Sequence, residues 1–372
     1  MTTRTEFAGL QGASWTGYLA ALGVLRLLTE AGLPVRMGWG MQGPHVAWLE
    51  HPPLGGDDLA AGVAREVERH LDAFDPFPGR LKLSEVSPSE YRDAVAAATK
   101  RDDRLALDLL AAFGSDAASE PTAAVKVNGE GKAAKGRGGK TPGKSAEAAG
   151  AAEAFEGTNA EAASLAEGGL LNPPWCVLNG AQQRNLFGIV RRLRELATPP
   201  GPVPKRGRRA TADAETVPLT ERVRSVLEGP WRESDDRASL YLDPSVREHA
   251  YRWTDPTKDP PRSDGIANLL ALVGLSLLPA VPVDQGGTVV LSSACCAAID
   301  KRRTAVSWPI WRGAIGLGAV RRLLLIPGLA EKKFAADFAA CGIATVLRAE
   351  VYPIEGAKGA KAYTHPEPIW LG

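Results

Sequence analysis

A run of cationic side chains near the middle of the chain is the feature of this sequence best suited to chemistry. Residues 184–209 hold eight basic residues and one acidic residue. Guanidinium groups donate paired hydrogen bonds to phosphate and stay charged at any cellular pH. The segment therefore predicts a surface that holds nucleic-acid phosphates, through Arg184, Arg191, Arg192, Arg194, Lys205, Arg206, Arg208 and Arg209.

The first four of these arginines belong to an expected helix that begins at about Ala181. Its apolar side chains recur at helical spacing and define a packed side, at Leu186, Ile189, Val190 and Leu193. Arg191 and Arg194 are three residues apart and are therefore neighbours on the remaining surface. The alternative is a solvated helix face whose arginines pair with carboxylates of the same chain. The basic loop that follows favours the nucleic-acid interpretation, since helix and loop together would form an electrostatic clamp.

Polar residues and a second basic run extend this predicted surface. Asn179, Gln182 and Gln183 precede the helix or lie in its first turn, where their amides would donate to phosphates or read base edges. The run Lys301-Arg302-Arg303 adds further phosphate contacts, of which we retain Arg302 and Arg303.

The motifs of common catalytic sites are absent from the sequence. It has no phosphate-binding loop ending in Gly-Lys-Ser/Thr and no Gly-x-Ser-x-Gly nucleophile elbow. Its five histidines are scattered without metal-ligand spacing, and the adjacent Cys295 and Cys296 would point to opposite faces of a strand. We therefore expect no catalytic residue, no metal and no cofactor. An enzyme whose site combines scattered polar residues is the alternative, with Asp243, His249, Asp255 and Asp259 as its members.

Composition indicates an ordered protein without membrane spans. The chain has 372 residues, 44% of them hydrophobic, which is enough for roughly two domains with a sizeable core. No apolar stretch approaches the ~20 residues that cross a bilayer, no signal peptide is evident, and four cysteines do not form a disulfide framework. We expect a cytoplasmic protein with no membrane partner. Net charge is only +1, so the basic middle must be balanced by an acidic remainder.

Patterning predicts an α+β fold built from two helix–strand blocks around mixed or antiparallel sheets. The N-terminal block, residues 1–115, is expected to contain strands at 5–10, 35–39 and 45–49 and helices at 16–31, 57–74 and 89–113. The C-terminal block, residues 169–372, is expected to contain helices from about 181 and at 264–278, 318–325 and 331–341, and strands at 288–293, 305–309, 343–353 and 362–366.

Two segments are expected to lack regular structure. Residues 116–168 are rich in Ala, Gly, Lys and Glu, so burial cannot offset the entropy of ordering them, and we predict a disordered insertion. Residues 198–216 are rich in Pro, Gly and Arg and are predicted to form a flexible basic loop.

Large aromatic residues and one repeated pattern concern packing. Trp253, Trp308 and Trp311 would stack on bases, lie in a subunit interface or pack in the core, and core packing is favoured. The apolar helices at 18–28 and 268–278 each contain an internal glycine and lead into a strand. Two similar halves and chance likeness both remain open as explanations.

Several of these segments together resemble a known family. The opening Leu10-Gln-Gly-Ala-Ser-Trp-Thr-Gly-Tyr-Leu-Ala-Ala-Leu-Gly-Val-Leu-Arg-Leu-Leu is similar to the N-terminal motif of large-subunit proteins of type I-U (I-G) CRISPR effector complexes. Tyr251-Arg-Trp-Thr-Asp-Pro, Leu277-Leu-Pro, Trp308-Pro-Ile-Trp and Val320-Arg-Arg-Leu-Leu resemble members of the same group, in the same order. The Lys/Gly-rich insertion departs from that pattern.

The resemblance implies a non-catalytic subunit of an RNA-guided complex in antiviral defence. Such subunits contact the target DNA and guide RNA backbones and the short duplex motif that flanks the target, while base pairing reads the sequence. Its expected partners are the other CRISPR effector subunits, guide RNA, target DNA and a helicase-nuclease. Besides the enzyme alternative, a structural interaction protein whose basic segments meet an acidic partner remains open.

Overall fold

The computed structural model describes most of the chain outside its middle. The described residues are 2–54, 58–116, 169–178, 185–198, 217–232, 235–236, 238–244, 262–284, 287, 289–299, 303–326, 328–329, 335–353 and 361–371. The predicted insertion, apart from residue 116, and nearly all of the predicted basic loop lie outside these ranges.

Two apolar helices form the centre of the molecule, α1 (Trp15–Glu30) and α8 (Gly265–Leu275). Every residue of α8, and every residue of α1 except its last two, is buried, as their all-round apolar patterns predict. Side-chain oxygens cap both N-termini, because Ser14 accepts from the Gly17 amide and Asp264 from the amides of Ile266 and Ala267.

Glycines let the two central helices meet backbone to backbone. A Cβ atom added to Gly23 would lie 2.1 Å from the carbonyl oxygen of Leu270, and one added to Gly274 would lie 2.0 Å from that of Leu19. Only glycine fits at such distances, so both internal glycines of the repeated pattern belong to this contact.

Every strand pair in the described residues is antiparallel. One sheet has the order β1-β3-β2, and a larger one has the order β11-β10-β9-β8 with β12 also on β10. The first sheet consists of β1 (Thr3–Gln11), β2 (Arg36–Trp39) and β3 (Val46–His51). The larger consists of β8 (Cys296–Ala298), β9 (Thr304–Trp311), β10 (Ile343–Pro353), β11 (Lys361–Tyr363) and β12 (Glu367–Leu371). Two short pairs remain, β4 (Asp235–Asp236) with β5 (Arg262–Ser263) and β6 (Ala280–Asp284) with β7 (Val289–Ser293).

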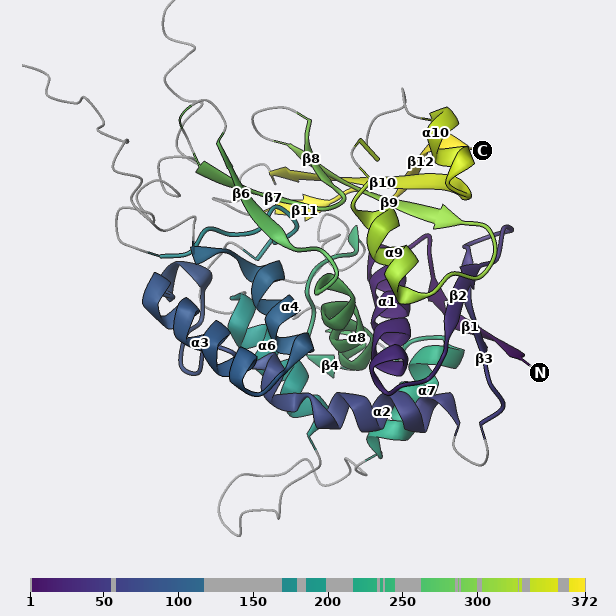
Figure 1. Ribbon diagram of the computed structural model, residues 1–372, viewed down its shortest axis with the longest axis horizontal. Helices are drawn as coiled ribbons and strands as arrows, with labels where there is room; N and C mark the ends of the chain where they lie inside the picture. Colours follow the sequence, from purple (N-terminus) through teal and green to yellow (C-terminus); the bar gives the residue numbers. More distant parts are fainter. Residues whose placement is uncertain are drawn as a thin grey trace, which may run out of the picture.

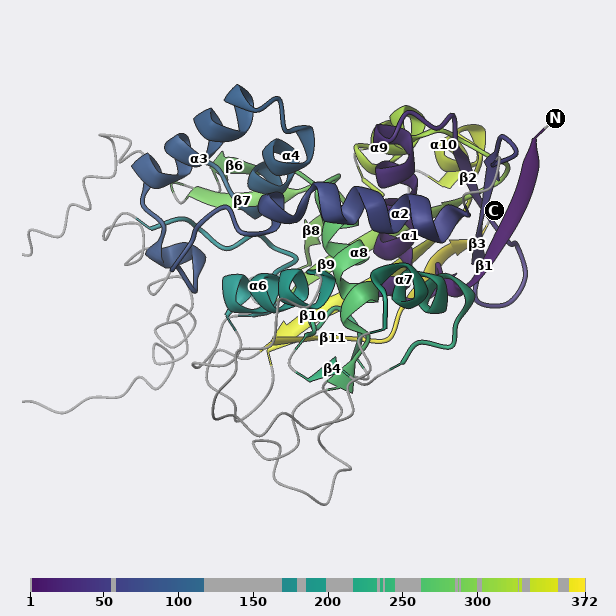
Figure 2. The same ribbon diagram turned by 90° about the horizontal axis from the view of Figure 1, so that it is seen from below.

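The remaining helices surround this centre, and the α+β prediction is confirmed. Helices α3, α4 and α6 gather at the end of the molecule away from the sheet of β1 to β3, and α2 runs between the two ends (Figures 1 and 2). Their bounds are α2 (Leu59–Arg69), α3 (Pro88–Lys100), α4 (Arg104–Phe113), α6 (Leu186–Ala197), α7 (Leu219–Glu228), α9 (Leu317–Leu324) and α10 (Ala335–Ala340). Two 3₁₀ turns, η1 (Leu71–Phe74) and η2 (Leu83–Glu85), lie between α2 and α3.

Two predicted helices are divided in the structure. The described residues of 57–74 form α2 and then the 3₁₀ turn η1, and residues 89–113 form two helices, α3 and α4. Asp102 has φ of +52°, a left-handed conformation that ends α3. Asp103 then caps the next helix, since its side chain accepts a hydrogen bond from the Ala106 amide at 3.0 Å. The apolar spacing continues through the break, which is why periodicity alone does not reveal it.

An aromatic cluster joins the first and last parts of the chain. Trp308 Nε1 donates to the Gly12 carbonyl at 2.9 Å, and its ring lies 4.7 Å from that of Trp15. Trp311 Nε1 donates to the Met37 carbonyl at 3.0 Å. Both C-terminal tryptophans are buried, which confirms the core-packing interpretation for them, whereas Trp253 lies outside the described residues.

Candidate nucleic-acid interface

Helix α6 carries three of the predicted phosphate-binding arginines. It begins after Asn185, whose side chain accepts a hydrogen bond from the Gly188 amide at 2.8 Å. The predicted packed side is confirmed, because Leu186, Phe187, Ile189, Val190 and Leu193 are buried. Its arginines therefore lie on the opposite, more accessible side of the helix.

Each of these three arginines has a carboxylate partner in the same chain. Arg191 Nη1 lies 3.7 Å from Asp75 Oδ1 and donates to the Arg80 carbonyl at 2.9 Å. Arg192 pairs with Glu195 at 3.2 Å, and Arg194 pairs with Asp72 at 2.8 Å. This arrangement favours the alternative interpretation of the helix, in which the arginines are neutralised within the chain.

The other predicted contacts add one further pair. Arg303 Nη1 lies 3.2 Å from Glu350 Oε2. The rest of the predicted set lies outside the described residues, namely Asn179, Gln182, Gln183, Arg184, Lys205, Arg206, Arg208, Arg209 and Arg302. The structure therefore does not bring the predicted set together as one surface of unpaired charges in the part of the chain that it describes.

A second group of cationic side chains, on α3 and at the start of α4, has no such partners. We call it the α3–α4 corner and define it as Arg92, Lys100, Arg101 and Arg104. All four are exposed, and no carboxylate of the described residues forms an ion pair with any of them. This group is not predicted from the sequence, because Asp102 and Asp103 lie within its basic run and lower the local net charge.

The corner is held in place by hydrogen bonds from both helices. Ser87 and Glu90 form a capping box at the start of α3, with the Glu90 amide donating to Ser87 Oγ at 3.2 Å and the Ser87 amide to Glu90 Oε2 at 2.8 Å. Tyr91 donates to the carbonyl oxygens of Leu110 at 3.1 Å and Gly114 at 3.0 Å, which joins α3 to the end of α4. Burial, and secondarily the negative charge of Asp116, raises the pKa of Tyr91 to about 12, so this donor stays protonated.

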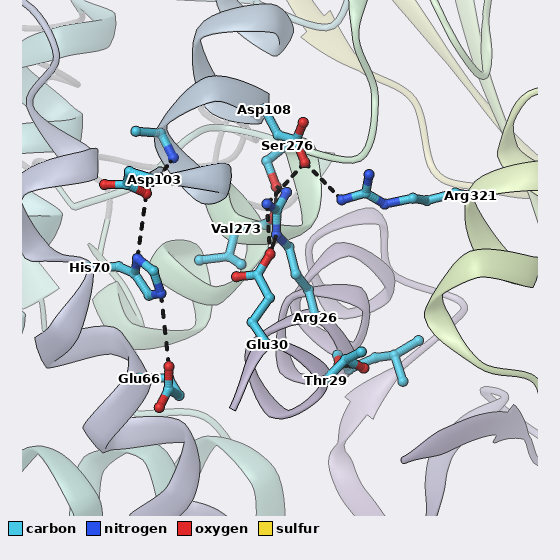
Figure 3. A network of polar contacts seen from close by, with 12 residues as sticks. Arg26, Thr29, Glu30, Glu66, His70, Asp103, Asp108, Val273, Ser276 and Arg321 are labelled. Carbon is cyan, nitrogen blue, oxygen red and sulfur yellow. Dashed lines mark hydrogen bonds and ion pairs between the residues drawn. The ribbon is translucent and has the colours of Figure 1, made fainter. Parts of the chain in front are cut away.

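A polar network ties α4 to the centre of the molecule (Figure 3). Arg26, which is fully buried in α1, lies 2.9 Å from Asp108 of α4 and from Glu30, and it donates to Ser276 at 2.5 Å. Arg321 of α9 reaches the same Asp108 oxygen at 2.7 Å. One carboxylate on α4 is thus shared by cations from two other helices, which fixes α4 relative to α1 and α9.

A histidine connects the corner to α2. His70 lies between two carboxylates, with Nδ1 at 3.6 Å from Asp103 and Nε2 at 3.8 Å from Glu66 (Figure 3). Asp103 also caps α4, so its contact with His70 links the end of α2 to the turn that carries the basic side chains. The two networks position the corner and leave its cations exposed.

Beside the corner lies a pocket of about 330 Å³, which we call the α3–α6 pocket. Small apolar side chains form most of its walls, and four charged residues complete it. The charged residues are Asp72, Asp75, Arg101 and Arg194; the others are Ala73, Pro76, Pro78, Ala94, Ala97, Ala98, Ala106 and Leu110. One residue of the corner and one arginine of α6 therefore line the same cavity.

The scattered-residue enzyme hypothesis gains no assembled site from the described residues. Asp243 accepts a hydrogen bond from Ser14 at 3.0 Å, whereas His249, Asp255 and Asp259 lie outside those residues. Within the described ranges, no group of three or more His, Cys, Asp or Glu side chains is arranged to hold a metal ion. The same ranges contain no helix with the length and apolar character of a membrane span.

Comparison with protein-family models and with curated proteins finds no match for this chain.

Proposed function

We propose that this chain is a non-catalytic subunit of a CRISPR RNA-guided effector complex, in which it contacts nucleic-acid backbones. The observation that carries the nucleic-acid part is the α3–α4 corner, where four exposed cations have no carboxylate partner in the described residues. Unpaired cations attract phosphates more strongly than paired ones, because no internal ion pair has to be broken when a strand binds.

The proposal of a CRISPR subunit rests on the family resemblance. Several segments of this chain that carry the resemblance contact one another in the described structure. The turn at Gly12 and the ring of Trp15 both meet Trp308, and Tyr18 lies 6.4 Å from Trp311, measured between ring centroids. The glycine of the N-terminal motif, Gly23, forms the contact with α8, the helix that precedes Leu277-Leu-Pro. The resemblance is thus carried by residues that build the core.

In this proposal the arginines of α6 have a different role from the one predicted. Arg191, Arg192 and Arg194 hold the helix against the segment that contains Asp72, Asp75 and Arg80, or pair along it. The predicted contacts that lie outside the described residues remain part of the proposed strand-binding surface, namely Asn179, Gln182, Gln183, Arg184, Lys205, Arg206, Arg208, Arg209 and Arg302.

Salt-dependent binding tests the nucleic-acid part. The full chain is titrated onto labelled single-stranded DNA at several salt concentrations, with fluorescence anisotropy as the readout. Each phosphate contact contributes a slope of about 0.7 to the decrease of log K with log salt for a single strand. We expect the variant R92A/K100A/R101A/R104A to bind more weakly and to lose a slope of roughly 2–3.

A matched control separates this site from an effect of overall charge. The variant R36A/R192A/R224A/R303A also removes four cations, but each of these arginines is ion-paired, with Glu50, Glu195, Asp58 and Glu221, and Glu350 respectively. We expect it to bind as the unaltered chain does. Equal losses in both variants, or no DNA binding by the unaltered chain, would overturn the proposed contact surface.

Co-purification tests the CRISPR part separately. The chain is tagged, expressed together with the products of its neighbouring genes, and purified in low salt. We expect the associated proteins to bring along a small RNA of defined length that carries a repeat sequence. Recovery of the chain alone or of proteins without such an RNA would contradict the proposal.

A further inference from the structure

The α3–α6 pocket has the dimensions and lining of a site for a small planar group. Its volume of about 330 Å³ lies at the lower end of the ~300–1,000 Å³ typical of small-molecule sites. Alanines of α3 and α4 and two prolines provide short, flat walls, at Ala94, Ala97, Ala98, Ala106, Pro76 and Pro78. Such walls leave room for a ring to lie between the helices.

Two polar atoms of the lining residues have no hydrogen-bond partner, Asp75 Oδ1 and Arg194 Nε. The side chain of Asp75 is 12% exposed, and its Oδ1 is buried without a donor. Arg191 Nη1 lies 3.7 Å away, beyond hydrogen-bonding distance. Asp75 Oδ1 therefore has only the ion pair with Arg191 and no hydrogen bond, so a ligand N–H that reached this carboxylate after a side-chain adjustment would be favoured.

The cationic residues of the pocket provide hydrogen-bond donors, whereas Asp75 provides an acceptor. Arg101 is exposed and has no ion pair among the described residues, and Nε of Arg194 is buried without a hydrogen-bond partner. Guanidinium groups donate and never accept hydrogen bonds, so the exposed Arg101 favours a ligand with acceptor atoms. Arg194 pairs with Asp72 through Nη2, so its Nε takes no part in that ion pair.

Carboxylates and guanidinium groups together exclude the simplest ligands. A bare anion would meet Asp72 and Asp75, and a bare cation would meet Arg101 and Arg194. The lining instead fits a neutral ring whose edge carries adjacent N–H donors and oxygen or nitrogen acceptors. Among nucleobases, guanine offers N1–H and N2–H donors beside the O6 and N7 acceptors that arginine recognises.

We propose that the α3–α6 pocket binds an unpaired guanine base of a nucleic-acid strand. This proposal rests on the proposed function and adds base recognition to it. Lys100 and Arg104 flank Arg101 in the sequence, so cations suited to the phosphates of the same strand lie next to the pocket. Unstacked bases in single strands are recognised in this way, through side-chain contacts to their edges combined with contacts to the backbone.

The test compares single-stranded probes that differ in one base. Short labelled oligothymidines carrying one central guanine, inosine, adenine or cytosine are titrated with the full chain. We expect guanine to bind about tenfold more tightly than adenine or cytosine, because a bidentate base contact discriminates by about that factor or more. Inosine lacks the N2 amino group, so it should bind with intermediate affinity.

Two pairs of variants then locate the effect. Asp75→Asn should abolish the guanine preference, whereas Asp93→Asn, which alters an exposed acid of α3 outside the pocket lining, should retain it. Ala97→Phe should fill the pocket without a change of charge, whereas Ala96→Phe, at the neighbouring exposed alanine that does not line the pocket, should have no effect. Thermal unfolding of each variant confirms that it is folded.

The outcomes distinguish this inference from the proposed function. Equal binding of all four probes, with the corner variant still impaired, would overturn base recognition and leave backbone contact intact. Failure of every probe to bind would overturn both. Full displacement of the guanine probe by equimolar guanosine monophosphate would identify a free nucleotide as the ligand and would overturn the assignment to a strand.

Discussion

Helix α6 and the α3–α4 corner both carry several cationic side chains, but their surroundings differ. On α6, Arg191, Arg192 and Arg194 each have a carboxylate within 4 Å. At the corner, no side chain has such a partner in the described residues, although acidic residues interrupt its sequence. The comparison shows that a local count of charges in a sequence does not reveal which charges are available to a ligand.

The largest expected effect is a loss of stability on replacing Arg26, the most deeply buried of the ion-paired arginines. Replacing Arg26 with Met leaves Asp108 and Glu30 without their common partner, so the free energy of unfolding should fall by about 3 kcal/mol. Urea denaturation measures it. Arg104→Met at the exposed corner should change stability by less than about 0.5 kcal/mol. Similar values for both variants would contradict the distinction.

Removing carboxylates from the neighbourhood of α6 should make its arginines resemble those of the corner. The double variant Asp72→Asn/Glu195→Gln releases Arg194 and Arg192 from their ion pairs. We expect single-stranded DNA to bind about threefold more tightly, with a steeper salt dependence, because two more cations become available. The control variant Glu228→Gln/Asp337→Asn removes two exposed acids elsewhere and should change affinity less. Equal gains would show that total charge alone matters.

Single substitutions compare one residue from each class. Arg104→Ala should weaken single-stranded DNA binding about twofold and lower the salt slope by about 0.7, the value of one phosphate contact. Arg192→Ala should leave both quantities unchanged, since Arg192 pairs with Glu195. Anisotropy titrations at several salt concentrations measure both. A larger loss of binding for Arg192→Ala than for Arg104→Ala would instead indicate that α6 contacts the DNA.

The smallest expected effect is a pH dependence beside the corner. The Ser87 amide and then the Arg80 guanidinium donate to Glu90 and hold the pKa of that carboxyl below its ordinary value. The carboxylate therefore stabilises the folded state above its unfolded pKa of about 4.3, and this contribution is lost as the pH falls through its lower folded pKa. Glu90→Gln should lower the melting temperature slightly at pH 7, and the difference should vanish in acid. A difference independent of pH would contradict the assignment.

Much of the fold follows from local patterns, whereas the candidate site does not. All-round apolar patterns predict α1 and α8, and local patterning predicts β9, β10 and β11 of the larger sheet but not its short strand β8 or its last strand β12. The break at Asp102 is missed because a left-handed residue leaves the apolar spacing intact. The partners of Arg191 and Arg194 lie more than 100 residues earlier, at Asp75 and Asp72, so no local pattern reports them.

The pocket is equally invisible in the sequence. Its lining combines residues from η1, α3, α4 and α6 and from the turns that follow η1 and α3, and these residues form no recognisable sequence motif. Small residues such as Ala97 are typical of any helix surface. They become the wall of a cavity only when another helix lies opposite, which depends on the tertiary arrangement.

The glycine contact between α1 and α8 has a consequence for how the chain is made. Synthesis at about 5–20 residues per second places α8 outside the ribosome roughly 12–50 s after α1. Throughout that interval, the face of α1 that carries Gly23 lacks the helix that covers it in the finished molecule. Nascent chains should therefore engage a holding chaperone from the first helix onward, and release should follow the appearance of residues 265–275.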